Sequence, residues 1–329
     1  MKLPRRQFLH LAAGAAALPA MSRITWAQAY PTRPITMIVP FAPGGAADVM
    51  ARMMSEPLRA FLGQPVIIEN ASGGGGSIGV GRAVRAAGDG HTLSIGTTGS
   101  HVLTGALYSL QWDLVKDLEP IALLVSEPLM IVGRKGLPAQ DLKELIAWLK
   151  ANPDKASQGH AGVGATGHIT GVIFQRETNT RFQFVPYRGG GPALQDLVAG
   201  QTDLEMEPVS NFLQQVRAGN LKAYAVAAKT RSAVVPDIPT VDEAGLPGFY
   251  RSVWLGLWLP KGASKDVITK LSAAVQAALA EPNLRSRIAE IGQEIFPREQ
   301  QTPEGLAAHQ KAEIEKWWPI IKAAGIRGE

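Results

Sequence analysis

From residue 30 onward, the chain alternates short apolar runs with segments whose apolar residues recur every three or four positions. Runs of the first kind are typical of buried strands, and segments of the second kind are typical of amphipathic helices. The segments expected to form strands are 35–41, 65–70, 92–96, 121–126, 129–133, 182–187, 202–207, 221–228 and 253–259. This alternation predicts an α/β protein with doubly wound, mainly parallel sheets flanked by helices.

The expected helices differ in how clearly they begin and end. The apolar residues that share one face of the expected helix 142–152 are Leu142, Leu145, Ile146 and Leu149. Asp48 is expected to open an earlier helix. Pro57 is expected to end or kink that helix, because a proline lacks the N–H group and its ring clashes with the preceding turn.

The hydrophobic pattern at the end of the chain differs from that of the rest. Segments 264–281 and 302–326 predict helices with little strand between them. About 300 residues are more than one core usually takes, so two domains are expected. If the apolar segments 121–133 and 253–259 carry the chain between the domains, the first domain is discontinuous. The expected boundaries are 30–131 with 254–329 for domain 1, and 132–253 for domain 2.

The first 29 residues predict a signal peptide. A positive start precedes an apolar run that is too short to span a bilayer, and the segment ends at Ala27-Gln28-Ala29. We therefore expect cleavage after Ala29 and a periplasmic product. Arg5-Arg6 resembles the twin-arginine export signal, and a chance Arg-Arg in an ordinary signal is the alternative.

The leader also changes the charge balance. The chain has 33 Lys and Arg against 28 Asp and Glu. The leader contains four of these basic residues and no acidic one, so the net charge of the remaining chain is 29 − 28 = +1. Nucleic-acid binding therefore loses its main support. The absence of cysteine excludes disulfides and thiolate metal sites. No histidine pair has a zinc-like spacing, so neither a metal nor a cofactor is expected.

Glycine-rich turns follow the ends of expected strands. These turns are PGGAAD (43–48), TTGSH (97–101), HAGVGATGH (160–168) and RGGGP (188–192). In an open parallel sheet, ligands bind at the carboxyl ends of the strands, and a glycine turn before a helix presents free N–H groups to an anion. The turns together predict a binding cleft for an anion. The alternative for each turn alone is an ordinary tight turn.

Motifs that suggest other chemistry are weak. G-x-G-x-x-G occurs at 74–79 and 162–167, as expected by chance in a chain with 35 glycines. Ser77 fits the G-x-S-x-G pattern of hydrolases, but six residues separate it from the preceding strand, so it is expected to start a helix. A secreted serine hydrolase using Ser77 remains an alternative. His160 and His168 bracket one turn, and either faces a common cavity or bonds to nearby backbone.

Several blocks, in order, resemble the periplasmic receptors of tripartite tricarboxylate transporters, known as Bug receptors. The blocks are ITMIVPFAPGGAAD, QPVIIENASGGGGSIG, KDLEPIALLVSEP, LKELIAWLKANP, FVPYRGGGPALQDLVAGQTDL, VRAGNLKAYAVAA, PDIPTVDEAGLPGF and KWWPIIKAAGI. The resemblance implies a monomeric two-domain binding protein of the Venus-flytrap type (type II), without catalysis. It would hold a dicarboxylate, or an aromatic or amino-acid carboxylate, and deliver it to large and small membrane subunits. A sensor that reports the ligand to a signalling kinase is an alternative.

The resemblance also implies the residues of the cleft. Those of the first domain are Phe41, Ala42, Gly44, Gly45, Asp48, Ser100 and His101. Those of the second domain are Gly162, Gly164, Ala165, Thr166, His168, Arg188, Gly189, Gly190, Asp203 and Glu207. His160 stands where the family usually has a serine, and this bulkier group is able to donate a hydrogen bond and to carry charge.

Overall fold

The computed structural model describes residues 30–323 and 325–328, so the predicted signal peptide lies outside the described residues. The strands join in one sheet with the order β2-β1-β3-β9-β4-β7-β5-β6, and β8 and β10 pair with β4. The strands are β1 (Ile35–Val39), β2 (Val66–Asn70), β3 (Thr92–Thr97), β4 (Leu118–Arg134), β5 (Ser157–His160), β6 (Gln183–Pro186), β7 (Leu204–Pro208), β8 (Leu221–Val226), β9 (Ser252–Pro260) and β10 (Glu294–Ile295).

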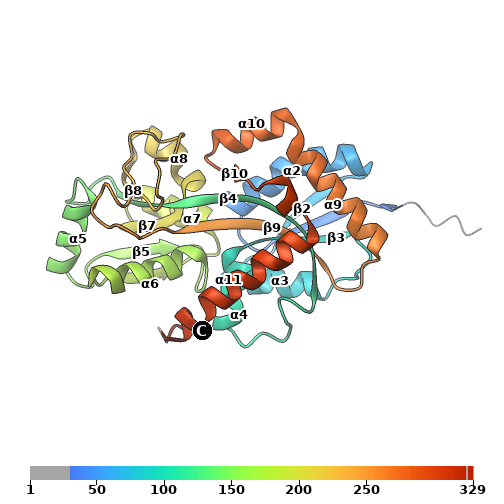
Figure 1. Cartoon of the computed structure of the whole chain (residues 1–329). Helices are drawn as coiled ribbons and strands as arrows, with labels where there is room; N and C mark the ends of the chain where they lie inside the picture. The colour runs from blue at the N-terminus through green and yellow to red at the C-terminus, as the bar shows by residue number, and fades with distance from the viewer. Residues whose placement is uncertain (1–29, 324, 329) are drawn as a thin grey trace, which may run out of the picture.

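The two ends of this sheet are parallel and its middle is antiparallel. At one end β1 pairs in parallel with β2 and β3, and at the other end β5 pairs in parallel with β6 and β7. The long strands β4 and β9 pair antiparallel to each other and to their neighbours between these ends. Figure 1 shows β4 and β9 running side by side from one half of the molecule to the other. The predicted α/β class with two domains is confirmed, and we call the halves the first lobe (β1–β3) and the second lobe (β5–β8).

Strand β4 corrects one prediction. Segments 121–126 and 129–133 were expected to form separate strands, but β4 runs without a break from Leu118 to Arg134. Pro128 does not end it, because Pro128 lies where β4 changes partners: residues up to 128 pair with β9, and residues from 129 pair with β7 and β8. A proline at that point interrupts neither ladder in its middle.

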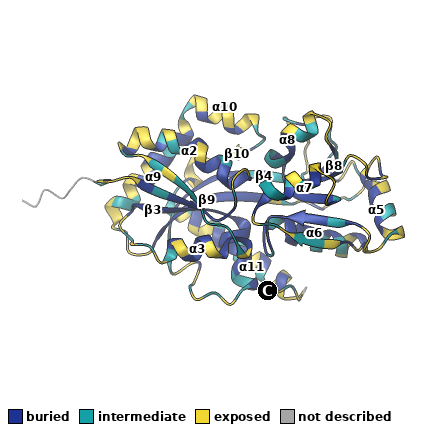
Figure 2. Cartoon of the chain, turned by 180° about the vertical axis from the view of Figure 1, so that it is seen from behind, coloured by how far each residue is buried: buried dark blue, intermediate teal, exposed yellow. Residues whose placement is uncertain are grey.

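Helices cover both faces of the sheet in each lobe, with their exposed sides outward (Figure 2). Those of the first lobe are α2 (Ala46–Leu62), η1 (Gly74–Gly76), α3 (Ser77–Val84), η2 (Gly99–Leu103), α4 (Thr104–Leu107), α9 (Lys265–Ala280), α10 (Pro282–Glu290), η3 (Arg298–Gln300) and α11 (Pro303–Ala323). Those of the second lobe are α5 (Leu142–Ala151), α6 (Thr166–Thr178), α7 (Gly190–Val198) and α8 (Val209–Arg217).

Each lobe has its own apolar core. In the second lobe, Leu142, Leu145 and Leu149 of α5 are fully buried together with Phe174 of α6, as the spacing predicts. Complete burial of a leucine side chain contributes about 1.5–3 kcal/mol. Packing of this strength fixes α5 on the sheet.

Helix α2 contains Pro57 and continues to Leu62, so of the two expectations for Pro57, an end or a kink, the end is wrong. A proline inside a helix costs about 3 kcal/mol. Met54 and Leu58, on either side of it, are buried in the core of the first lobe. Burial of these two side chains offsets the cost. The helix begins at Ala46, two residues before the expected Asp48.

Candidate ligand-binding site

A pocket of about 40 Å³ lies between the lobes. Its lining comes from the ends of β1, β3, β5, β6 and β7, from the segments that follow them, and from Val253 of β9. The lining residues are Phe41, Gly45, Ala46, Ala47, Thr97, Ala161, Ala165, Thr166, Gly190, Glu207, Pro208, Asn211 and Val253. All four glycine-rich turns of the sequence contribute to it, so the structure brings together what the sequence placed at separate strand ends.

Four helices begin at this pocket. Glu127 accepts from Ser210 N in the first turn of α8, whereas the other three have no side-chain cap. The N-cap residues of α2, α6 and α7 are Gly45, Ala165 and Gly189, and none of them offers a side chain to the first N–H groups. Helices α5 and α9, which begin away from the pocket, are capped by Asp141 and Ser264. The first N–H groups of a helix have no partner within it, and the helix dipole is positive there. The pocket is therefore suited to an anion.

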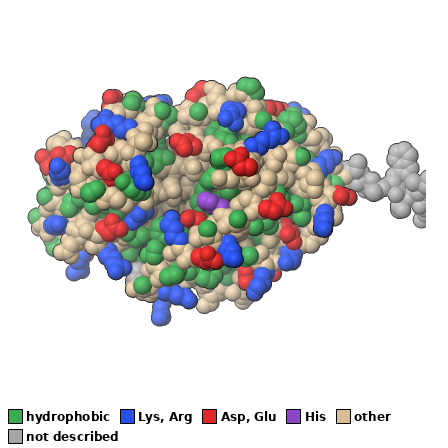
Figure 3. Space-filling view, viewed as in Figure 1, with side chains coloured by type: hydrophobic (Ala, Val, Ile, Leu, Met, Phe, Trp, Pro, Cys, Tyr) green, Lys and Arg blue, Asp and Glu red, His purple; other side chains and the backbone are tan. Residues whose placement is uncertain are grey.

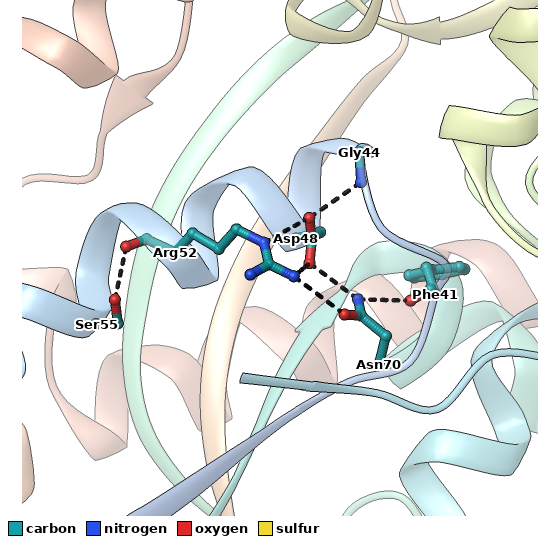
Figure 4. A network of polar contacts seen from close by, with 6 residues as sticks. All are labelled: Phe41, Gly44, Asp48, Arg52, Ser55 and Asn70. Carbon is teal, nitrogen blue, oxygen red and sulfur yellow. Dashed lines mark hydrogen bonds and ion pairs between the residues drawn. The ribbon is translucent and has the colours of Figure 1, made fainter. Parts of the chain in front are cut away.

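Asp48 holds the first of these turns in place (Figure 4). Its Oδ2 accepts hydrogen bonds from Gly44 N (3.0 Å) and Arg52 Nε (3.0 Å), and its Oδ1 accepts from Asn70 Nδ2 (2.9 Å). Asn70 Nδ2 also donates to the carbonyl of Phe41 (3.0 Å). Burial raises the pKa of Asp48, but the bonds from Arg52, Gly44 and Asn70 outweigh it and leave the pKa below its ordinary value. The carboxylate faces its own loop and is absent from the pocket lining.

Two histidine side chains hold the turn after β5 by accepting hydrogen bonds from its backbone. His160 Nδ1 accepts from Gly162 N and His168 Nδ1 accepts from Gly164 N, both at 3.2 Å, and the two rings lie 4.6 Å apart. Burial lowers the pKa of His160 to about 3 and that of His168 to about 4. Both rings are therefore neutral. His160, whose position suggested a charged contact with the ligand, instead supplies an acceptor to the backbone of the turn.

Ser100 and His101 lie behind the wall of the first lobe. Ser100 Oγ accepts from Thr97 N (3.0 Å). The ring of His101 stacks on Trp258 with centroids 4.0 Å apart, and burial lowers its pKa to about 3. Neither side chain is exposed. These two residues position Thr97, which does line the pocket.

The last group of expected residues is divided. Glu207 and Gly190 line the pocket, whereas Asp203 lies at the opposite end of β7, where it accepts from Arg134 Nε (2.7 Å). Arg188 is exposed, and its carbonyl accepts from Ala42 N across the lobes (2.9 Å). The structure thus brings Glu207 to the pocket and keeps Asp203 away from it.

Sequence reasoning missed part of the lining. Ala46, Ala47 and Thr97 belong to turns that the sequence did single out. Asn211, in α8 after β7, and Val253, within β9, had no signal, because neither lies in a glycine-rich turn. Among the described residues, Thr166 Oγ1 and Asn211 Oδ1 are buried polar atoms of the lining that have no hydrogen-bond partner. Unpaired buried groups of this kind are available to a ligand.

The two lobes touch at the carbonyl of Val163. Tyr108 of the first lobe donates from its hydroxyl to the carbonyl of Val163 in the second (2.8 Å). A Cβ atom on Gly75 would lie 2.2 Å from the same carbonyl oxygen. Only glycine permits this approach, so the structure is a closed arrangement of the lobes.

The features that would indicate other activities are weak in the structure. Ser77 begins helix α3, as predicted, and no hydrogen bond joins it to a histidine in the described part of the chain. No group of three or more His, Asp and Glu side chains within residues 30–323 and 325–328 is placed to hold a metal ion. No helix in that part is long and apolar enough to cross a membrane. The face in Figure 3 carries basic and acidic side chains interspersed.

Two α/β lobes joined by paired strands, with a pocket between them, define a solute-binding protein of the periplasmic type. The chain belongs to the tripartite tricarboxylate transporter family receptors, whose family model matches residues 50–326. Curated relatives include a UPF0065 protein of the TAR-I ttuE-ttuC' intergenic region from Agrobacterium vitis, 36% identical over 296 residues (90% of this chain and 86% of the relative). Protein BugT of Bordetella pertussis is 33% identical over 303 residues, which are 92% of each chain.

Solved structures agree with this membership. The periplasmic binding protein BugD has a TM-score of 0.88 and 37% identity, covering 91% of this chain and 100% of its own. MatC from Rhodopseudomonas palustris, with bound malate, has a TM-score of 0.86 and 38% identity, covering 89% and 100%. Another R. palustris protein, with adipate, has a TM-score of 0.86 and 30% identity, covering 91% and 99%. These relatives are solute-binding proteins.

Proposed function

We propose that this protein is a periplasmic receptor that binds a small organic carboxylate between its lobes and delivers it to the membrane subunits of a tripartite tricarboxylate-type permease. The observation that supports it best is the convergence of three uncapped helix N-termini on one pocket. Similar chains whose structures contain malate and adipate support a carboxylate as the ligand.

The physical basis is an anion site without a cation. Lys and Arg are absent from the described residues that line the pocket. A negative charge at one helix N-terminus gains about 0.3–1 kcal/mol at an exposed site and up to about 2 kcal/mol where it is partly buried. Because three such termini act together, a carboxylate can be held by backbone dipoles alone.

The proposal includes the expected organisation of the chain. The lobes correspond to 30–131 with 254–329 and to 132–253, and they close on the ligand by a hinge. The leader is removed after Ala29 during export. Gly45, Ala165, Thr166 and Gly190 contact the carboxylate, and Phe41 packs against the rest of the ligand.

A melting experiment tests the carboxylate site. The purified protein is screened with organic acids, including malate and adipate, and each hit is compared with its methyl ester. A ligand at about 100 times its Kd stabilises the fold by roughly 2.7 kcal/mol. With about 2.1 cal/mol/K of unfolding entropy per residue over about 300 residues, the melting temperature rises by about 4 °C. An ester that raises it as much as the acid would overturn the proposal.

Gly45→Val supplies the matched variant. The φ of Gly45 is −87°, and a Cβ atom there meets nothing closer than Gly190 N at 3.6 Å. Valine therefore fits the backbone, but its branches occupy the space between Gly45 and Gly190 where the carboxylate is proposed to lie. We expect the variant to melt within about 2 °C of the wild type and to show no shift with the acid.

A further inference from the structure

Glu207 is the one ionisable side chain among the described residues that line the pocket. It lies at the end of β7 and is 4% exposed. Its Oε1 accepts one hydrogen bond, from Ala161 N at 3.2 Å. A carboxyl group in a pocket that lacks cations is unusual for an anion receptor, because two negative charges repel strongly where water is excluded.

The groups around Glu207 do not neutralise it. From β4, Glu127 adds a second buried carboxyl, which accepts from Ser210 and Gln293. On β7 itself, Glu205 is fully buried and has no hydrogen-bond partner on either oxygen. The backbone of Gly167 at the start of α6 packs against the carboxyl. Burial, and then the charge of Glu127, raise the pKa of Glu207 to about 7.

The unpaired polar atoms of the lining include an amide oxygen. Asn211 lies four residues after Glu207, and its buried Oδ1 has no partner. A carboxylate and an amide oxygen that face one pocket require a donor from the ligand. The helix N-termini of α2 and α7, with Gly45 and Gly190, belong to the same lining, lie beside the Asn211 amide and offer donors.

We propose that the ligand is a carboxylate that also carries an ammonium group, an amino acid in its zwitterionic form, and that Glu207 binds this ammonium. The inference rests on the proposed carboxylate receptor and extends it to a ligand class. The two ends of such a ligand match the two kinds of partner in the pocket. A plain dicarboxylate would place a second negative charge beside Glu207, whereas an ammonium forms a charge-assisted hydrogen bond there.

Matched ligand pairs test the class. Each of the twenty protein amino acids is compared by calorimetry with the acid of the same carbon skeleton that lacks the amine, such as aspartate with succinate. We expect at least one amino acid to bind at least tenfold more tightly than its partner acid. A dicarboxylate that binds as tightly as the matching amino acid overturns the inference and leaves the carboxylate receptor standing. If no acid binds, or if methyl esters bind equally well, the proposed function itself falls.

Two variants separate a contact from a general effect of buried charge. Glu207→Gln keeps the shape of the side chain, and we expect it to weaken the amino acid roughly 10- to 100-fold, the loss typical of a charged hydrogen bond. The partner acid should bind as tightly as to the wild type or more tightly, because the charge that repels it is removed. Glu205→Gln, two residues earlier on the same strand and outside the pocket lining, should keep the preference for the amine. An equal loss in both variants would contradict a direct contact.

The dependence on pH gives a readout that packing alone would not change. The ammonium requires ionised Glu207, whose pKa is about 7, so lowering the pH from 8 to 5.5 should weaken amino-acid binding by about 30-fold. Plain acids should bind more tightly over the same range, because protonated Glu207 no longer repels them. In Glu207→Gln both slopes should vanish. Parallel slopes for amino acid and acid in the wild type would overturn the assignment of Glu207.

Discussion

Replacing Asp48 by alanine tests how the first turn of the pocket is held. The substitution removes the acceptor for Gly44 N and Asn70 Nδ2 and the ion pair with Arg52. Each of the two hydrogen bonds is partly buried and contributes about 1 kcal/mol. The Arg52 side chain is 53% exposed, so the pair contributes only about 0.5–1 kcal/mol. The total loss is roughly 2–3 kcal/mol. For about 300 residues, this lowers the melting temperature by about 4 °C.

The same helix offers a control. Glu56 pairs with Arg59 on α2, but both side chains are more than half exposed. Glu56→Ala should therefore lower the melting temperature by less than about 1 °C. Calorimetric binding of an acid found in the screen gives the second readout. Asp48→Ala should bind it at least tenfold more weakly, because Gly44 and Phe41 lose their common anchor, and Glu56→Ala should bind it as the wild type does.

Acid pH gives an independent check on Asp48. Its pKa in the folded protein lies below the ordinary value, so its stabilising effect is complete above the unfolded pKa of about 3.9 and is lost as the pH falls through the folded pKa. The difference in melting temperature between wild type and Asp48→Ala should be constant from pH 5 to 8 and should shrink below about pH 4. Equal melting and equal binding in the two proteins at pH 7 would refute the proposed role. If Asp48→Ala does not fold, Asp48→Asn replaces it.

Further predictions concern closure and export. Gly75→Val should weaken ligand binding at least tenfold and abolish ligand-induced compaction in small-angle scattering, because the valine side chain would collide with the carbonyl of Val163. Gly63 also has a positive φ, but a Cβ there meets nothing within 4 Å, so Gly63→Ala should keep both the binding and the compaction. The wild type should become more compact with ligand, and identical profiles at saturation would exclude a hinge. The exported protein should have the mass of a chain that starts at Tyr30, and normal export after Lys replaces Arg5 and Arg6 would exclude the twin-arginine route.

The sequence predicts most of the strands because their apolar runs are short, separate and bounded by turns. The structure places β1, β2, β3, β6, β7, β8 and β9 within about two residues of the predicted segments. Strand β5 (Ser157–His160) was not predicted, because its sequence SQGH contains no apolar run. The errors lie where tertiary packing outweighs local preference. Pro57 remains inside a helix because both of its apolar neighbours are buried, and Pro128 remains inside a strand because that strand changes partners there.

For the site, the sequence indicates the turns better than the side chains within them. Glycines at strand ends reveal where backbone approaches a ligand, and all four glycine turns line the pocket. Polar side chains near the turns are ambiguous, because they either face the ligand or support the loop. Four such side chains are buried and form hydrogen bonds within their own lobe rather than facing the pocket: Asp48, His101, His160 and His168. Only the positions of their acceptors and donors in space resolve this, and periodicity does not contain that information.

The position of β9 between β3 and β4 has a consequence for the order of folding. β9 is synthesised more than 100 residues after both neighbours, yet it pairs with β3 through Thr97 and with β4 from Leu118 to Pro128. Contacts of such long sequence separation form late, because closing the long intervening loop costs chain entropy before the new contacts stabilise the structure. The second lobe, whose strands β5 to β8 are contiguous in sequence, has its whole core once residue 253 has been made, because Val241, Phe249 and Val253 belong to that core. The first lobe, although synthesised first, is therefore the last to fold, and a fragment ending at β4 exposes the unpaired edge of β3.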